Sequence, residues 1–180
     1  MENSKKTQEN PMRTIRIAEI VLNCGALGEK LERSIKLLKM ISGKEPIITK
    51  GKKRLPAFGI RPGLPTGCKV TVKGAAAIVL LKRLLDAVSN QIPEKQICNG
   101  QLSFGIPEYI EIPGVQFLRE IGILGLDVSI NLVRAGSRIE QRKSKPGHVP
   151  LRHRITKQET KEFMQRTFDI KIMEKKNERK

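Results

Sequence analysis

Strict alternation of apolar and polar residues in two short stretches constrains the fold more than any other feature of this sequence. Residues 68–73 read Cys-Lys-Val-Thr-Val-Lys, and residues 127–134 alternate with Val128, Ile130 and Leu132 on one side. Because successive side chains of a strand point to opposite faces, each stretch predicts a strand with one buried and one solvated face. We therefore expect an antiparallel sheet with one wet, basic face, since antiparallel sheets tolerate water on one side.

Helical periodicity surrounds these strands. Apolar residues recur at steps of three and four from Leu27 to Ile41, and Gly43 follows, which predicts an amphipathic helix with a glycine stop. A nearly apolar helix is expected over 75–88, and the capping-box sequence at 156–159 opens a helix to about residue 167. Further strands are expected over 14–23, 46–50, 102–109 and 169–173. These elements predict an α+β domain with helices packed on one face of the sheet.

We expect a single domain over residues 13–173, with a flexible tail at 1–12 and a basic tail at 174–180. Within the domain, residues 136–153 are rich in Arg, Lys, Ser, Pro and Gly. This composition predicts an extended basic arm that orders on a partner rather than a packed element. Phe104 and Tyr109 are expected in the core. The three cysteines are odd in number and widely spaced, so we expect reduced, buried thiols rather than a disulfide framework or a zinc site.

The charge of the chain is large and clustered. Lys and Arg number 35 against 18 Asp and Glu, a formal net charge of +17. Clustered charge attracts a polyanion, whereas evenly spread charge only keeps a protein in solution. Each of two basic stretches contains a single acid, Glu45 in the first and Glu140 in the second. The candidate phosphate-binding residues are Lys44, Lys50, Lys52, Lys53, Arg54, Arg61, Lys69 and Lys73 in the first, and Arg134, Arg138, Arg142, Lys143, Lys145, Arg152 and Arg154 in the second.

The loop over residues 50–67 is the most unusual stretch. It joins two predicted strands and contains four glycines, three prolines, five cations and one aromatic ring, Phe58. Glycine lets the backbone approach a surface closely, and an aromatic ring among cations can stack on a base. A solvated surface loop is the plain alternative. We favour a functional loop, because loops this long inside a compact domain usually carry function.

The sequence contains no set of residues typical of an enzyme or a cofactor site. No nucleophile stands with a base, and the glycines at 59–67 lack the Gly-Lys-Ser/Thr ending of a nucleotide-binding loop. His148 and His153 have no neighbouring Cys, so we expect phosphate contacts from them rather than metal binding. The longest apolar run, 75–81, is too short for a bilayer crossing. The start of the chain lacks the layout of an export signal, so we expect a cytoplasmic protein.

Several collinear motifs carry a family likeness. They are Asn10-Pro11-Met12, residues 41–50 (Ile-Ser-Gly-Lys-Glu-Pro-Ile-Ile-Thr-Lys), Phe58-Gly59-Ile60-Arg61, residues 64–72 (Leu-Pro-Thr-Gly-Cys-Lys-Val-Thr-Val), Ser103-Phe104-Gly105, Gly125-Leu126-Asp127-Val128 and His153-Arg154-Ile155. In this order the motifs resemble ribosomal protein five of the large subunit, the universal 5S RNA-binding family, in its archaeal and eukaryotic form. The resemblance covers roughly residues 10–172.

The resemblance implies a fold, a place and partners. The fold would be α+β with a curved antiparallel sheet and a long basic loop between strands two and three. The place would be the central protuberance of the large ribosomal subunit, with 5S rRNA, large-subunit rRNA and neighbouring ribosomal proteins as partners. The loop around residues 51–63 would contact P-site tRNA. A basic module that binds nucleic acid nonspecifically, or an anionic membrane surface, is the alternative function.

The resemblance also implies roles for single residues. The 5S-contacting positions of the family match Asn23, Lys44, Phe58 and Thr71, and its basic loop matches Lys52, Lys53, Arg54 and Arg61. Lys44 stands where the family usually has Gln, so a neutral amide becomes a charge. Asn and Thr side chains hydrogen-bond sugar or phosphate, Phe stacks on an unpaired base, and cations neutralise phosphates, so these roles agree with the chemistry of the residues.

Overall fold

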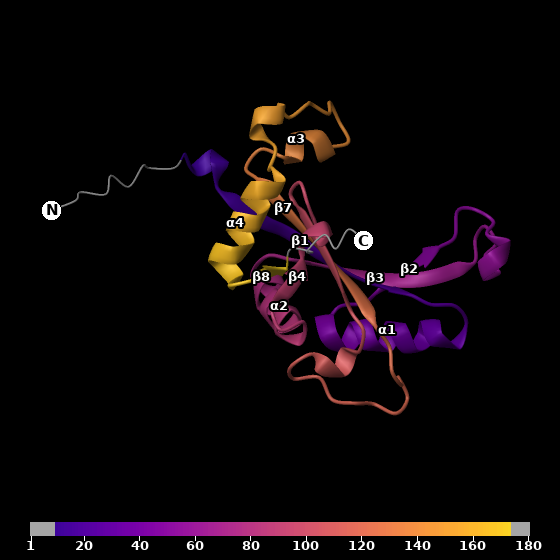
Figure 1. Cartoon of the computed structure of the whole chain (residues 1–180). Helices are drawn as coiled ribbons and strands as arrows, with labels where there is room; N and C mark the ends of the chain where they lie inside the picture. The colour runs from indigo at the N-terminus through magenta and orange to yellow at the C-terminus, as the bar shows by residue number, and fades with distance from the viewer. Residues whose placement is uncertain (1–9, 174–180) are drawn as a thin grey trace, which may run out of the picture.

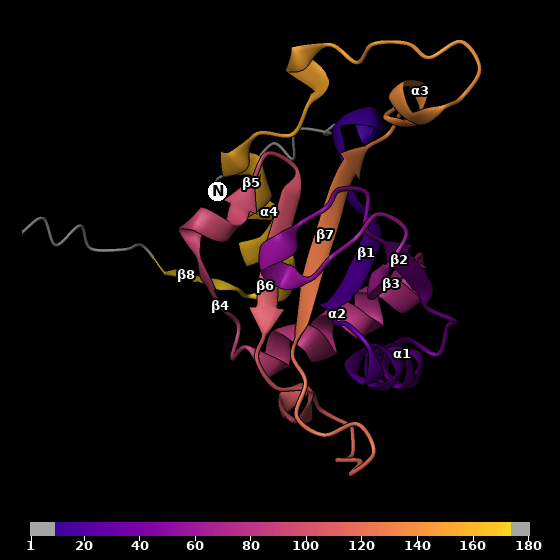
Figure 2. The same cartoon turned by 90° about the vertical axis from the view of Figure 1, so that its right-hand side faces the viewer.

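A computed structural model of the chain describes residues 10–173. Its centre is a six-stranded antiparallel sheet in the order β2-β3-β1-β7-β6-β5, and β4 and β8 pair in parallel as a separate small sheet (Figures 1 and 2). The elements are β1 (Ile15–Gly25), α1 (Glu29–Ser42), β2 (Ile47–Lys50), β3 (Pro65–Lys73), α2 (Ala75–Ala87), β4 (Gln91–Pro93), β5 (Ile97–Cys98), β6 (Gln101–Ile106), β7 (Leu126–Arg134), α3 (Arg138–Gln141), α4 (Lys157–Phe168) and β8 (Lys171–Met173). The predicted α+β class with an antiparallel sheet is confirmed.

The alternating stretches form the strands that they predict. In β7, Val128, Ile130 and Leu132 are buried while their neighbours face outward, and β3 buries Cys68, Val70 and Val72. They belong to one hydrophobic core, in which α1 and α2 pack against β3 and β1, and α4 packs against β5. Alternation with period two places every second side chain in this core. A one-residue slip of register would therefore turn the apolar side chains of the strand toward solvent.

The helices follow their sequence signals closely. In α1, Gly43 adopts the left-handed conformation with φ of 66° and ends the helix through its N–H to the Lys39 carbonyl. The periodicity predicts Leu27 on the apolar face, but α1 begins two residues later and Leu27 is 39% exposed. In α4, Thr156 and Glu159 form the predicted capping box, in which each side chain accepts a hydrogen bond from the other's backbone N–H.

Three predictions need correction. The strand expected over 102–109 ends at Ile106, and the buried Tyr109 begins a 3₁₀ turn. The last strand is shorter than expected, 171–173, and pairs with β4 outside the main sheet. The flexible tail at 1–12 stays a prediction, because residues 1–9 lie outside the described residues, as does the tail at 174–180, and residues 11–13 form an exposed 3₁₀ turn. Cys98 is exposed, because it lies in a two-residue strand at the sheet edge.

The other two cysteines are buried free thiols, as expected. Cys24 and Cys68 lie opposite each other on β1 and β3. Burial, together with the nearby thiol of Cys68 and the carboxylate of Asp127, raises the pKa of the Cys24 thiol to about 12. Burial likewise raises the pKa of Cys68. Both side chains are therefore neutral at physiological pH and act as small apolar groups of the core.

The solvated face of the sheet is polar but basic only in part. Lys69, Thr71 and Lys73 of β3 face outward, as predicted. Across β1, β7 and β6 the outward residues are mostly neutral or acidic. By register they are Arg16, Glu19, Val21, Asn23, Asp127, Ser129, Asn131, Val133, Gln101 and Ser103. The expectation of a basic face thus holds for β3 and for Arg16 at the start of β1, because the alternation in β7 and β6 places polar residues outward without fixing their charge.

Candidate nucleic-acid interface

The segment between β2 and β3, residues 51–64, forms a hairpin loop that projects from the sheet edge (Figure 1). Its backbone is closed on itself, because Leu55 N donates to Ile60 O at 2.9 Å and Ile60 N donates to Leu55 O at 3.1 Å. A 3₁₀ turn over Pro56–Phe58 precedes Gly59, whose φ of 65° requires glycine or a similarly tolerant residue. The loop therefore has a defined backbone conformation that its own hydrogen bonds hold.

The hairpin loop presents its cations to solvent. Phe58 is 70% exposed at the tip, although an aromatic ring of this size is normally buried. The segment from Lys50 to Leu64 contains no acid, and none of its cations takes part in an ion pair among residues 10–173. The exposed cations are Lys50, Lys52, Lys53, Arg54 and Arg61. An exposed ring surrounded by unpaired cations is the arrangement that single-stranded nucleic acid favours.

The second basic segment, residues 136–153, is called the arm from here on. Its composition predicts no packed element, but it contains α3 and a 3₁₀ turn over Leu151–His153, and Val149 is buried. Local contacts override the polar composition, because Glu140 binds the backbone of Val149. The predicted cations of the arm remain exposed. They are Arg138, Arg142, Lys143, Lys145 and Arg152.

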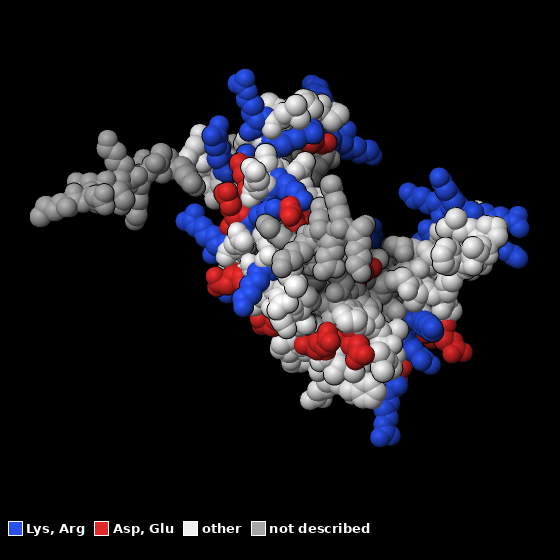
Figure 3. Space-filling view, viewed as in Figure 1, with Lys and Arg blue, Asp and Glu red and all other residues white. Residues whose placement is uncertain are grey.

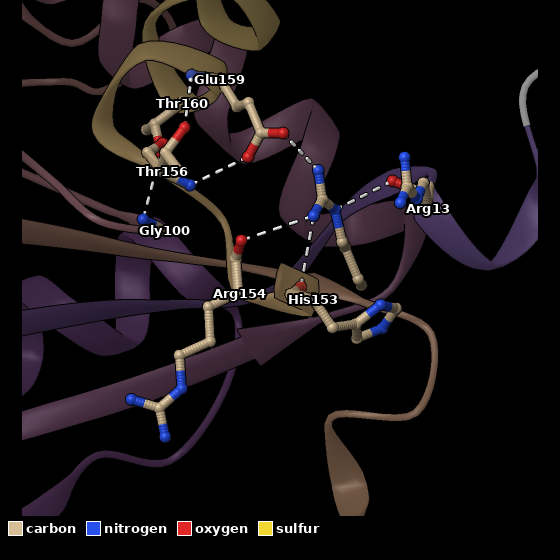
Figure 4. Close-up of polar contacts among 8 residues, drawn as sticks. Arg13, Gly100, His153, Arg154, Thr156, Glu159 and Thr160 are labelled. Carbon is tan, nitrogen blue, oxygen red and sulfur yellow. Dashed lines mark hydrogen bonds and ion pairs between the residues drawn. The ribbon is translucent and has the colours of Figure 1, made fainter. Parts of the chain in front are cut away.

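Arg134 is the least accessible of the candidate cations. Its side chain is 8% exposed, and its guanidinium donates to Glu159 Oε1 at 2.6 Å and to the carbonyls of Arg13, His153 and Arg154 at 3.1 to 3.4 Å. Figure 4 shows these acceptors converging from the N-terminal turn, the end of the arm and α4. Arg134 therefore joins three segments, and its guanidinium is buried and makes four hydrogen bonds within the protein.

Glu159, which accepts from Arg134, also caps α4. Glu159 Oε2 accepts from the Thr156 N–H at 2.9 Å, which closes the capping box of α4, while Oε1 accepts from Arg134. The Thr156 N–H first, and then Arg134, lower the pKa of the Glu159 carboxyl. Thr160, next to Glu159, receives the Gly100 N–H on its hydroxyl at 3.1 Å, which ties α4 to the turn between β5 and β6 (Figure 4).

Three further candidate residues are partly engaged within the protein. Lys73 forms an ion pair with Glu19 at 3.1 Å, and Arg154 forms one with Glu140 at 3.0 Å. His153 is half-buried and its Nε2–H donates to the Ala135 carbonyl at 2.8 Å, since a carbonyl can only accept. Lys73 and Arg154 stay sufficiently exposed to contact a phosphate, whereas His153 presents only part of its ring.

The remaining candidates lie on or beside the solvated face of the sheet. Asn23 pairs across the strands with Lys69 on one side and Asp127 on the other, and Thr71 lies one row along β3. Lys44 is exposed in the turn after α1, where its N–H donates to the Ser42 hydroxyl at 3.2 Å. These residues lie near the base of the hairpin loop, because β3 leads directly out of it.

The two basic projections leave the body at different places. In Figure 3, Lys and Arg side chains gather on the hairpin loop and on the arm, with the body of the molecule between them. The sequence predicts both clusters but not their separation, because separation depends on strand order. β2 lies at one edge of the sheet, and the arm continues from the far end of the central strand β7.

Sequence reasoning missed a patch of neutral polar side chains beside the interface. Ser103 of β6 and Ser129 of β7 face each other across the strands, with their hydroxyl oxygens 3.2 Å apart. Gln101 and Asn131 form the next row along the same face. The alternation over residues 101–106 is the signal that could have found them, because it buries Leu102, Phe104 and Ile106 and leaves Gln101 and Ser103 outward.

Two classes of site are missing from the described part of the chain. Residues 10–173 contain no group of three His, Cys, Asp or Glu side chains that could hold a metal ion. None of the helices in this part is long and apolar enough to cross a membrane. A basic α+β protein with two cation-rich projections is thus the class that the fold and the surface define.

Comparisons with known proteins identify the family within this class. The family model of ribosomal protein L5 matches residues 10–61, and the model of the C-terminus of the same ribosomal protein family matches residues 65–163. The chain is similar to the large ribosomal subunit protein uL5 of Sulfolobus acidocaldarius, with 41% identity over 97% of this chain and 98% of the relative. The protein of the same name from Nanoarchaeum equitans is 42% identical over 92% of this chain and 99% of its own length.

The chain belongs to the ribosomal protein L5 family. It is therefore a protein of the large subunit of the cytoplasmic ribosome, a structural component of a ribonucleoprotein and not an enzyme. The family resemblance noted in the sequence is confirmed. Membership also favours the ribosomal function over the alternative of a general basic module for membranes or nonspecific nucleic acid.

Proposed function

We propose that this protein binds 5S rRNA and large-subunit rRNA in the central protuberance, beside neighbouring ribosomal proteins, and that its hairpin loop contacts P-site tRNA. The observation that carries the proposal is the hairpin loop itself. It presents four exposed cations and an exposed Phe58 on a closed backbone without any acid, and the exposed Lys50 of β2 adjoins it. Cations on a preformed loop neutralise phosphates without a large ordering cost, and the ring offers a stacking platform.

The solvated sheet face supports the 5S contact. Asn23 and Thr71 face outward beside Lys69, and the hydroxyls of Ser129 and Ser103 lie on β7 and β6, the next two strands beyond β1. RNA exposes 2′-hydroxyls and base edges, which such neutral polar groups recognise through hydrogen bonds. The exposed cations of the arm would add phosphate contacts to large-subunit rRNA. Cations that contact phosphates and neutral groups that hydrogen-bond to sugars or bases therefore occur on the same protein. Phosphate contacts position the RNA, and base contacts recognise its sequence.

A salt titration tests the proposal. Binding of the full chain to 5S rRNA is measured between about 50 and 200 mM salt. If six to ten phosphates are neutralised, affinity falls by about three to five orders of magnitude over this range, because bound counterions are released. An affinity that does not change with salt would contradict the proposal.

A matched pair of variants locates the contact. Substituting Lys52, Lys53 and Arg54 with Ala removes three cations of the hairpin loop, and we expect the salt slope to fall by about 2 to 3. The control variant carries Lys82→Ala, Lys95→Ala and Arg166→Ala, which removes the same charge from exposed positions on α2, a 3₁₀ turn and α4. Equal loss in both variants would show that net charge, and not the hairpin loop, determines binding.

The same loop variant tests the tRNA contact separately. Large subunits assembled with the Lys52, Lys53 and Arg54 variant should bind P-site tRNA more weakly than subunits assembled with the control variant. Unchanged tRNA affinity would assign the hairpin loop to rRNA alone.

A further inference from the structure

The arm is folded back on itself, although nearly all of its residues are exposed. Gly147 N donates to the Ile139 carbonyl at 3.1 Å, and Arg142 Nε donates to the Lys145 carbonyl at 2.6 Å. Gly147 also lies so close to α3 that an added Cβ would meet Ile139 Cγ2 at 2.5 Å. These contacts return the chain to α3 within a few residues and give the arm a defined shape.

One carboxylate joins the two ends of this folded arm. Glu140 is the single acid between Gly136 and Arg154, and its Oε1 accepts from Val149 N at 3.1 Å and from Arg154 Nη2 at 3.0 Å. His148 Nδ1 lies 3.9 Å from the same oxygen. Val149, which Glu140 holds, is 8% exposed and the one buried residue of the arm. The N–H of Val149 first, and then Arg154, lower the pKa of the Glu140 carboxyl, so it is ionised at neutral pH.

We propose that Glu140 is a positioning residue for RNA binding: it holds the arm in the shape that presents its exposed cations as a preformed clamp for an RNA backbone. The inference rests on the proposed function, because a preformed arm has this role only if the protein binds RNA. Its physical basis is the cost of ordering a segment of this length during binding, which a segment that is already folded avoids. Glu140 itself would touch no phosphate.

Electrostatics alone predicts the opposite role. An acid among five cations repels phosphates, so its removal should raise the local positive potential and tighten binding. Positioning predicts weaker binding, because the freed arm must be ordered by the RNA. The two accounts therefore differ in the sign of the effect, and a single substitution separates them.

The experiment compares Glu140→Ala, Glu140→Gln and the control Glu162→Ala. All three raise the net charge by one. Glu162 is exposed on α4 and forms no ion pair among residues 10–173. Each full-length variant is titrated with purified 5S rRNA and with large-subunit rRNA at fixed salt. We expect Glu140→Ala to bind about tenfold more weakly than the wild type to at least one of the RNAs. The RNA affinity of Glu140→Gln should lie between those of Glu140→Ala and the wild type, because the amide oxygen of the new side chain still accepts from Val149 N.

Hydrogen exchange supplies a second measurement. Exchange of the Val149 amide should accelerate in Glu140→Ala, while amides of β7 keep wild-type protection. Binding of Glu140→Ala that equals or exceeds that of the wild type and of Glu162→Ala would overturn the inference. Failure of the wild type to bind either RNA is a different outcome, since it would overturn the proposed function and the inference with it.

Discussion

At the scale of single residues, Arg134 and Arg142 carry the same side chain in opposite surroundings. Arg134 is buried and donates to a carboxylate and three carbonyls, whereas Arg142 is exposed on the arm. The sequence predicts RNA binding for both, because each belongs to the same basic stretch. Sequence cannot separate them, since burial of Arg134 depends on α4 packing beside the end of β7. Residues distant in sequence therefore decide the role of a cation.

We expect Arg134→Met to destabilise the protein by about 1.5 to 3 kcal/mol, because hydrogen bonds to a charged group are lost at a buried position. Chemical denaturation measures the free energy of unfolding. Arg166→Ala is the control, since Arg166 is exposed on α4, and its effect should stay within about 0.5 kcal/mol. A free energy of unfolding of Arg134→Met equal to that of the wild type would contradict the structural role of Arg134.

Phe58 is the residue for which stacking predicts the largest single effect. Phe58→Ala should weaken RNA binding by about 1 to 3 kcal/mol, or about 5- to 150-fold, without changing the salt slope, because a ring and no charge is removed. The ring is 70% exposed, so the free energy of unfolding should hardly change. The titration is done with 5S rRNA. Unchanged affinity would place Phe58 on the tRNA side of the hairpin loop.

At the scale of elements, local signals predict most of the fold. Alternation defines β3 and β7, the glycine stop ends α1, and the capping box opens α4. Each signal acts between residues within a few positions of one another, so it can be read from the sequence. The short α3 and the pairing of β8 with β4 were missed, because α3 depends on Glu140 reaching Val149 and β8 on a strand about 80 residues away.

The capping box of α4 also predicts a pH dependence. The pKa of Glu159 is lowered in the folded protein, so its contribution to stability is present above the usual value of 4.5 and is lost as pH falls through the lowered value. The melting temperature of the wild type should therefore exceed that of Glu159→Gln at pH 6, and the difference should shrink below pH 4.5. Thermal melts over this range measure it. A difference that stays constant down to pH 3 would contradict the role of the charged form.

At the scale of the whole molecule, the chain separates its core from its charges. The buried face of the sheet packs against the helices, while the hairpin loop and the arm extend beyond that core. Composition and clustering predict a polyanionic partner, and the motifs predict the family. The positions of the two projections could not be predicted, because they follow from the order of strands β2, β3, β1 and β7 in the sheet.

Crosslinking in assembled large subunits tests most directly whether both projections contact RNA. Subunits are irradiated, and the peptides of this protein that carry ribonucleotides are identified by mass spectrometry. We predict crosslinked nucleotides on peptides from the hairpin loop and from the arm, with 5S rRNA among the attached RNAs. Peptides from both projections that carry no ribonucleotide, in particles where other ribosomal proteins crosslink, would contradict the account.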